Sequence, residues 1–252
     1  MATFFGEVLQ VTSRAVDEDD DDEYDEEIIS PCEMRWSVQT KTEIENGQKL
    51  TCSILIVAVG PAASGFASSY ILHDNFDRVG VLFSGMNERD VNTFSQKSIT
   101  DKTCYIYRSQ INKQLFVCQC NSIVLPEQAH PWVCELFHQL NVENCEVIVL
   151  NTAVTSTFRS EIPASELSTP FVKALWTSSF KGRPPFTSLE QPNVVSGLAS
   201  QILSYCEVQH VRALLCMCYT ESMMVDIPTL KSFKPVLEFT PLKGLIKEKS
   251  KC

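Results

Sequence analysis

Histidine is scarce in this 252-residue sequence, and the usual catalytic motifs are missing. There is no Gly-x-Ser-x-Gly elbow for a serine nucleophile and no His-Glu-x-x-His pair for a zinc hydrolase. The sequence has four histidines, none directly after a strongly predicted strand: His73, His130, His138 and His210. We expect His138 on the surface of a helix. A nucleophile with a neighbouring base is what a hydrolase requires, so we expect a protein that is not an enzyme.

An excess of positive charge is also missing. The formal net charge is −10, from 21 Lys plus Arg against 31 Asp plus Glu. Ten of the carboxylates lie in residues 17–27, DEDDDDEYDEE, so the remainder of the chain is neutral. Like charges at this density repel one another, so we expect residues 1–30 to be a disordered acidic arm. A neutral body argues against nucleic-acid binding, which needs a basic surface.

The first residues, MATFFGEVLQV, lack the basic stretch of a secretory signal. The eleven cysteines are odd in number and fit a reducing compartment, so we expect a cytoplasmic protein. Two Cys-x-Cys pairs, Cys118 with Cys120 and Cys216 with Cys218, have one intervening residue, whereas zinc and dithiol redox motifs usually have two or more. We therefore favour core packing over a zinc or redox site, and expect no metal or cofactor.

The uncharged run of residues 53–72 is long enough to cross a bilayer. Gly60 and Pro61 interrupt it, and its second half is rich in Ser, Ala and Gly. A spanning helix must be continuous and apolar, so we expect no membrane span.

Three continuous apolar runs rich in β-branched residues indicate strands buried on both faces: residues 54–59, 147–150 and 211–220. Such strands are typical of a mostly parallel sheet covered by helices, which predicts a layered α/β fold in a single domain over residues 31–247, followed by a short basic tail at 248–252. Weaker strands are predicted at residues 79–83, 104–108 and 115–120, and the segment between the last two is consistent with a hairpin.

Apolar residues at helical spacing predict three helices. One has Pro192 near its first turn and packs Val194, Leu198 and Ile202. Another starts at Pro131 and packs Val133, Phe137 and Leu140. The third is capped by Thr229 and buries Leu230, Phe233 and Leu237.

The run ILIVAVGPAASGF ends its apolar part at Gly60. Gly60 and Gly65 have the spacing of a phosphate loop, but Phe66 stands where that loop needs lysine. We interpret the segment as a strand turning into a helix. Open α/β sheets bind ligands beyond the carboxyl ends of their strands, so a shallow polar pocket is geometrically possible there. Its candidate residues are Gly60, Ser64, Asn151, Thr152, Thr220 and Glu221.

Longer strings are more specific than these patterns. They are TPFVKALWT from Thr169, LEQPNVVSGLASQILSYC from Leu189, CYTESM from Cys218, SFKPVLEFTPLKGLIK from Ser232, and FVCQC from Phe116. Together with the opening MATFFGEV and the acidic arm, they closely resemble the proteasome assembly chaperone 1 family.

The resemblance implies a scaffold like that of nucleoside phosphorylases, without the catalytic residues. It implies a heterodimer with proteasome assembly chaperone 2 that binds α-type subunits of the core proteasome. The pair would promote closure of the α-ring and prevent aberrant ring dimers, with no cofactor. It also implies a possible pool associated with the endoplasmic reticulum.

One departure concerns the end of the chain. The family ends in a hydrophobic residue, a tyrosine and a final residue, which insert between α-subunits. Here the last residues are IKEKSKC, and no tyrosine follows Tyr219. The resemblance therefore implies that the C-terminal ring-docking motif is absent from this chain, so that partner pairing survives while affinity for the ring falls.

Two alternatives stay open on the sequence. The acidic arm can make the protein a binding module for other basic or oligomeric clients. A residual α/β hydrolase or phosphorylase acting near Gly60 is the other.

Overall fold

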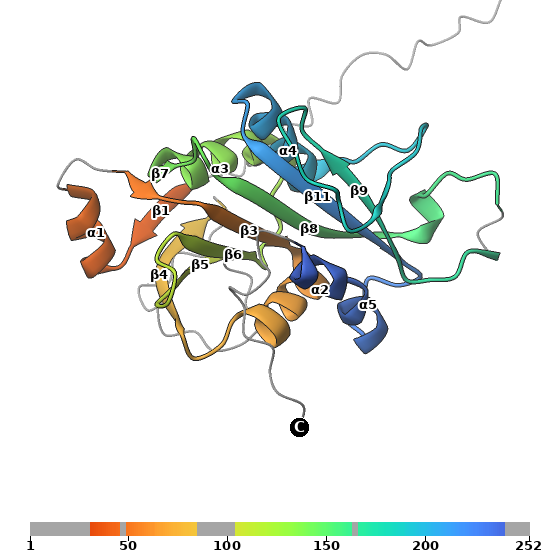
Figure 1. Cartoon of the computed structure of the whole chain (residues 1–252), viewed down its shortest axis with the longest axis horizontal. Coiled ribbons are helices and arrows are strands. Elements are labelled where there is room, and N and C mark those ends of the chain that lie inside the picture. Colours follow the sequence, from red (N-terminus) through yellow and green to blue (C-terminus); the bar gives the residue numbers. More distant parts are fainter. Residues whose placement is uncertain (1–30, 46–48, 85–103, 163–165, 240–252) are drawn as a thin grey trace, which may run out of the picture.

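The computed structural model describes residues 31–45, 49–84, 104–162 and 166–239. These residues form a large sheet with helices on both faces (Figure 1). The expected acidic arm (1–30) and basic tail (248–252) lie outside the described residues. The sheet has nine strands, in the spatial order β1 (Glu33–Trp36), β4 (Phe76–Phe83), β5 (Cys104–Ser109), β6 (Leu115–Cys120), β3 (Ile54–Val59), β8 (Glu146–Val154), β11 (Arg212–Thr220), β9 (Phe171–Trp176) and β10 (Thr187–Ser188).

The centre of the sheet is parallel, as predicted. Strands β6, β3, β8 and β11 run in the same direction, and their side chains are almost all buried because helices cover both faces. The predicted hairpin is confirmed, since β5 pairs antiparallel with β6. On the outer sides, β1, β4 and β9 add antiparallel pairs. A separate short sheet joins β2 (Leu50–Thr51) to β7 (Leu140–Asn141).

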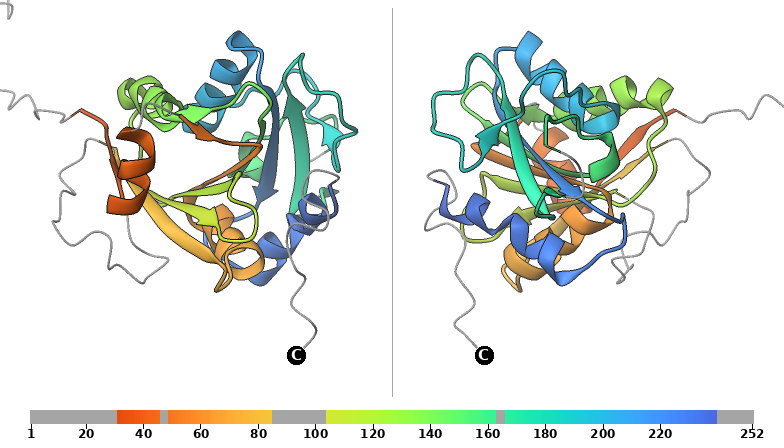
Figure 2. Two further views of the ribbon diagram at one scale, coloured as in Figure 1. Left: turned by 60° about the vertical axis from the view of Figure 1, so that its left-hand side comes forward. Right: turned by 90° about the vertical axis from the view of Figure 1, so that its right-hand side faces the viewer.

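Two helices, α3 (Pro126–His138) and α4 (Gly197–Val208), cover one face of the sheet (Figure 2). The expected start at Pro131 is wrong: α3 begins at Pro126, which occupies its first turn, and Leu140 belongs to β7. His138 is exposed, as predicted. The expected start of α4 at Pro192 is also wrong. Gly197 opens the helix with a φ of +74°, a conformation that favours glycine, and Val194 lies outside it.

The other face carries α2 (Gly60–Phe66), the π-helical turn η1 (Ala67–Ile71), α5 (Ile227–Ser232) and the 3₁₀ turn η5 (Lys234–Glu238). Phe233 is buried as predicted, and its ring lies 5.5 Å from that of Phe66. Thr229 is not the cap of α5. Asp226 is, because its Oδ1 accepts a hydrogen bond of 2.8 Å from the backbone N–H of Thr229.

The uncharged run at residues 53–72 spans β3, α2 and η1. Across the described ranges, none of the helices has the length and apolar character needed to cross a membrane. Both Cys-x-Cys pairs are fully buried: Cys118 and Cys120 lie in the core under α3 and α4, and Cys216 and Cys218 lie in the core under α2 and α5. They therefore pack as core residues, as we interpreted them. The described part of the chain contains no cluster of three or more His, Cys, Asp or Glu suited to a metal ion.

The remaining short elements are α1 (Val38–Glu45), which follows the edge strand β1, and η3 (Thr155–Thr157), which follows β8. Of these two, η3 matters for the site, because it begins the loop that leaves the carboxyl end of β8.

Candidate functional site

The carboxyl ends of the parallel strands lie at one edge of the sheet, where the candidate polar residues were expected. Gly60 turns the chain from β3 into α2 with a φ of +83°, and a Cβ at this position would meet nothing within 4 Å. The glycine is therefore required by the backbone conformation rather than by a close approach to other atoms. Ser64 is fully buried, and its hydroxyl donates to the carbonyl of Ala58 at 3.4 Å.

We expected Asn151 and Thr152 to follow their strand, but the structure places both within it. β8 continues to Val154, because it keeps its pairing with β11 up to the pair Val154 and Thr220. The side-chain Oδ1 of Asn151 accepts a 2.8 Å hydrogen bond from the backbone N–H of Thr152, and Thr152 is buried. Both residues are thus part of the sheet.

Thr220 ends β11 and is buried, with its hydroxyl oxygen 3.3 Å from that of Thr229 in α5. Glu221 is exposed and accepts a 2.8 Å hydrogen bond from the hydroxyl of Thr169. The two candidates from β11 therefore have partners in the chain itself.

Helix α5 folds back over this edge and packs against α2. A Cβ placed on Gly65 would lie 3.2 Å from Cδ2 of Leu230 and 3.6 Å from Cγ1 of Val225. The space beside Gly65 in α2 is thus occupied by the chain's own apolar side chains. Four hollows of 420 to 660 Å³ in the described surface have linings that include none of the candidates Gly60, Ser64, Asn151, Thr220 and Glu221.

The segment between β11 and α5 exposes apolar side chains instead. We call residues 221–227 the methionine loop. Its exposed fractions are 50% for Met223, 78% for Met224, 47% for Val225 and 65% for Ile227. Large apolar side chains gathered on one exposed segment are typical of a protein–protein contact surface. The sequence patterns did not predict this loop as a functional candidate, although the apolar run SMMV lies just beyond a predicted buried strand.

The methionine loop is held at both ends. At its start, Glu221 binds Thr169, and the backbone N–H of Met224 donates to the hydroxyl of Ser222 at 3.2 Å. At its end, Asp226 caps α5, and the hydrogen bonds from Thr229 lower the pKa of the Asp226 carboxyl. The apolar side chains are therefore presented from a fixed base.

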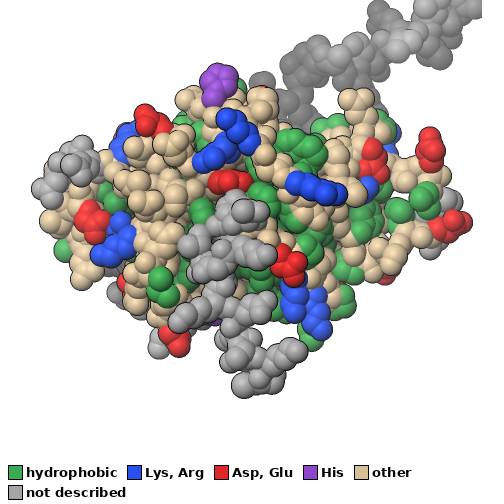
Figure 3. Space-filling view, in the orientation of Figure 1, with side chains coloured by type: hydrophobic (Ala, Val, Ile, Leu, Met, Phe, Trp, Pro, Cys, Tyr) green, Lys and Arg blue, Asp and Glu red, His purple; other side chains and the backbone are tan. Residues whose placement is uncertain are grey.

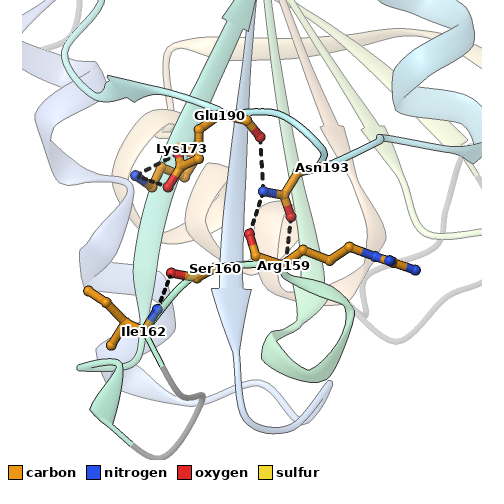
Figure 4. A network of polar contacts seen from close by, with 6 residues as sticks. All are labelled: Arg159, Ser160, Ile162, Lys173, Glu190 and Asn193. Carbon is orange, nitrogen blue, oxygen red and sulfur yellow. Dashed lines mark hydrogen bonds and ion pairs between the residues drawn. The ribbon is translucent and has the colours of Figure 1, made fainter.

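A second loop at the same edge follows β8 and is tied down by the polar network of Figure 4. The side chain of Asn193 accepts from the backbone N–H of Arg159 at 2.7 Å and donates to its carbonyl at 2.8 Å. Nearby, Lys173 forms an ion pair of 2.9 Å with Glu190. Burial raises the pKa of Glu190, but the hydrogen bond from Lys173, a backbone hydrogen bond and the charge of Lys173 together outweigh burial, so the net shift is downward.

This second loop carries another exposed apolar side chain, that of Ile162, at 52%. In Figure 3 hydrophobic and acidic side chains alternate over the right-hand end of the molecule, where the loops following β8 and β11 emerge in Figure 1. The edge as a whole therefore exposes apolar side chains from two loops.

Comparisons with known proteins agree with this geometry. A family model described as "Proteasome assembly chaperone 4" matches residues 1–252. A relative from Xenopus laevis named "Proteasome assembly chaperone 1" is 36% identical over 262 residues, covering 97% of this chain and 91% of the relative. The protein of the same name from Homo sapiens is 32% identical over 262 residues, covering 98% and 91%.

Solved structures share the fold at low sequence identity. Pyrococcus furiosus PbaA, described as an archaeal homolog of proteasome-assembly chaperone, superposes with a TM-score of 0.56 at 12% identity, covering 84% of this chain and 87% of that one. P. furiosus PbaB, described as an archaeal proteasome activator, gives 0.56 at 13% identity, covering 85% and 91%. The family is one of chaperones rather than a known class of enzyme. The match over the whole chain and the identities above 30% show that this chain belongs to the proteasome assembly chaperone 1 family.

Proposed function

We propose that this chain forms a heterodimer with proteasome assembly chaperone 2. The pair promotes assembly of the α-subunit ring of the core proteasome in the cytoplasm and prevents aberrant ring dimers. It does so without catalysis or a cofactor. The observation that carries the proposal is that a chain matching the family over its full length exposes an apolar loop on a fixed base.

The chemistry of the methionine loop favours the permanent partner over the ring. Interfaces of permanent complexes are apolar, and methionine is enriched in interface cores because its flexible thioether adapts to irregular surfaces. Met223, Met224 and Ile227 carry no charge and are largely exposed in the isolated chain. We assign them to the contact with proteasome assembly chaperone 2, while release from the ring requires a more polar, weaker surface.

The filled edge of the sheet supports a binding role as well. Leu230 and Val225 occupy the space beside Gly65, and Thr220 is paired with Thr229. An α/β enzyme would keep the carboxyl ends of its parallel strands open for substrate. The proposed activity therefore needs surface contacts alone.

The test is reconstitution. The chain is co-expressed with proteasome assembly chaperone 2, and the purified pair is mixed with α-type subunits and analysed by native electrophoresis. We expect co-purification of the two chaperones and a faster accumulation of seven-membered rings than with either chaperone alone. Failure of the two chains to co-purify, or ring formation at the same rate without them, would overturn the proposal.

A further inference from the structure

Two cysteine sulfurs lie close together inside the sheet. Cys104 on β5 and Cys120 on β6 are direct partners in the antiparallel register, and their Sγ atoms are 3.2 Å apart. Directly opposed residues of antiparallel strands have Cα atoms about 4.5–5.5 Å apart. This separation lies within the range of about 4.4–6.8 Å that a disulfide spans, so a bond requires no movement of the strands.

The other buried thiols are less well placed. Cys118 and Cys120 lie two residues apart on the same strand, β6, so they do not face each other across a pair of strands. Cys52 and Cys145 have their Sγ atoms 3.5 Å apart, farther than those of Cys104 and Cys120, and they precede β3 and β8 instead of facing each other on paired antiparallel strands. Burial likewise raises the pKa of Cys216.

The surroundings of Cys104 are those of a stabilised thiolate. The hydroxyl of Ser122 lies 3.0 Å from its Sγ. The indole N–H of the fully buried Trp132 has no hydrogen-bond partner among the described residues. Burial raises the pKa of Cys104, but the contacts of its sulfur with Cys120 and with the hydroxyl of Ser122 lower it below its ordinary value.

Both cysteines are fully buried. The segment that follows β6 is more open, because Ser122 is half-buried and the next residue, Ile123, is 69% exposed. Reaction with a small oxidant therefore requires a local opening of this segment.

We propose that Cys104 and Cys120 are a reversible disulfide site that reacts with hydrogen peroxide. The Cys104 thiolate attacks one peroxide oxygen, the O–O bond breaks, and a sulfenic acid and hydroxide form; the hydroxide takes up a proton to give water. The Cys120 sulfur then attacks the Cys104 sulfur, the S–S bond forms, and the sulfenic oxygen leaves as a second water with the Cys120 proton. Two thiols are oxidised by two electrons and peroxide is reduced, and an added dithiol reverses the change.

Peptide mapping of the full chain tests the site. After treatment with peroxide and blocking of free thiols, trypsin places Cys104 in the peptide 103–108 and Cys120 in the peptide 114–159. We expect these two peptides to be linked, with the loss of two hydrogen atoms. The peptide 114–159 also contains Cys118, Cys134 and Cys145. Fragmentation of its backbone between residues 119 and 120 and between residues 120 and 121 tells Cys120 from these three cysteines in the natural chain, so the assignment does not depend on the folding of a variant.

Matched variants sharpen the test. Cys118→Ser removes a buried thiol from the same strand and is expected to leave the cross-link intact, whereas Cys120→Ser is expected to abolish it. Dithiothreitol should restore the separate peptides. Retention of both thiols in peroxide, a link that fragmentation assigns to Cys118, or a link that survives in Cys120→Ser would overturn the proposal. None of these results depends on whether the chain assembles proteasomes.

Discussion

Replacement of Met223 and Met224 by serine removes the two most flexible apolar side chains of the methionine loop and is expected to weaken binding of proteasome assembly chaperone 2. Complete burial of a methionine side chain stabilises by about 1.5–3 kcal/mol. Met223 and Met224 are 50% and 78% exposed in the isolated chain, and these exposed fractions are what an interface can still bury. Scaling by these fractions gives about 2–4 kcal/mol for the double variant.

This free energy corresponds to a rise in Kd of roughly 20- to 600-fold, because about 1.4 kcal/mol equals a factor of ten. The assay is isothermal titration of the purified variant with proteasome assembly chaperone 2. The loop makes no core contact through these two side chains, so the urea midpoint of the variant should match that of the natural chain.

A matched control separates the loop from surface hydrophobicity in general. Val38→Ser with Val208→Ser removes side chains that are 84% and 73% exposed and lie at the start of α1 and the end of α4, away from the carboxyl edge. The control is expected to bind normally. The reasoning is refuted if the methionine variant binds within about threefold of the natural chain, or if the control loses affinity to the same extent.

Three further predictions concern stability and the acidic arm. Phe233→Ala should lower the free energy of unfolding by about 3–5 kcal/mol, since Phe233 is fully buried against Phe66; urea denaturation measures it, and a loss below about 1 kcal/mol would contradict the packing. Lys173 lowers the pKa of Glu190, so their ion pair stabilises the folded state above the ordinary carboxyl pKa, and this stabilisation is lost as the pH falls through the lowered pKa. The difference in urea midpoint between the natural chain and Glu190→Gln should therefore shrink on acidification. A difference that is independent of pH would exclude the ion pair as its cause. Deletion of residues 17–27 should leave binding of proteasome assembly chaperone 2 unchanged, as measured by the same titration; a large loss of binding would favour the alternative of an acidic-arm binding module.

The strands that form the middle of the sheet could be predicted because burial on both faces leaves an unmistakable pattern. Residues 54–59 and 211–220 are continuous apolar runs, and the structure places them as β3 and β11. The end of β8 was missed because Asn151 and Thr152 are polar, and their place in the sheet follows from pairing with β11. β1 and β9 were not predicted, since strands with mixed burial carry no such run.

Helix boundaries were less predictable, because proline marks a first turn without saying which proline is used. Pro126 starts α3 although Pro131 fits the same rule, and Pro131 lies inside the helix. For α4 the decisive residue is Gly197, whose positive φ turns the chain into the helix. The apolar spacing of Val194, Leu198 and Ile202 does not indicate that the helix begins at this glycine.

The candidate site shows where local patterns stop being informative. The sequence placed Gly60, Thr220 and Glu221 at the carboxyl edge, and the structure does the same. The sequence alone could not show that α5 returns to this edge, because Leu230 and Gly65, which lie close together there, are far apart in the chain. Whether an open pocket or a filled edge results is decided by that one tertiary contact.

The filled edge and the exposed loop are two consequences of the same local structure. Asp226 fixes the start of α5 by capping it, and Phe233 packs the far end of the segment against Phe66. Between these anchors Leu230 packs toward Gly65, and the residues that precede Asp226 must cross from the end of β11 to the start of α5 on the outside. Met223 and Met224 are exposed for that reason. The segment that occupies the place of a substrate therefore also creates the apolar surface, so an enzyme-like sheet can serve as a contact scaffold without any further element.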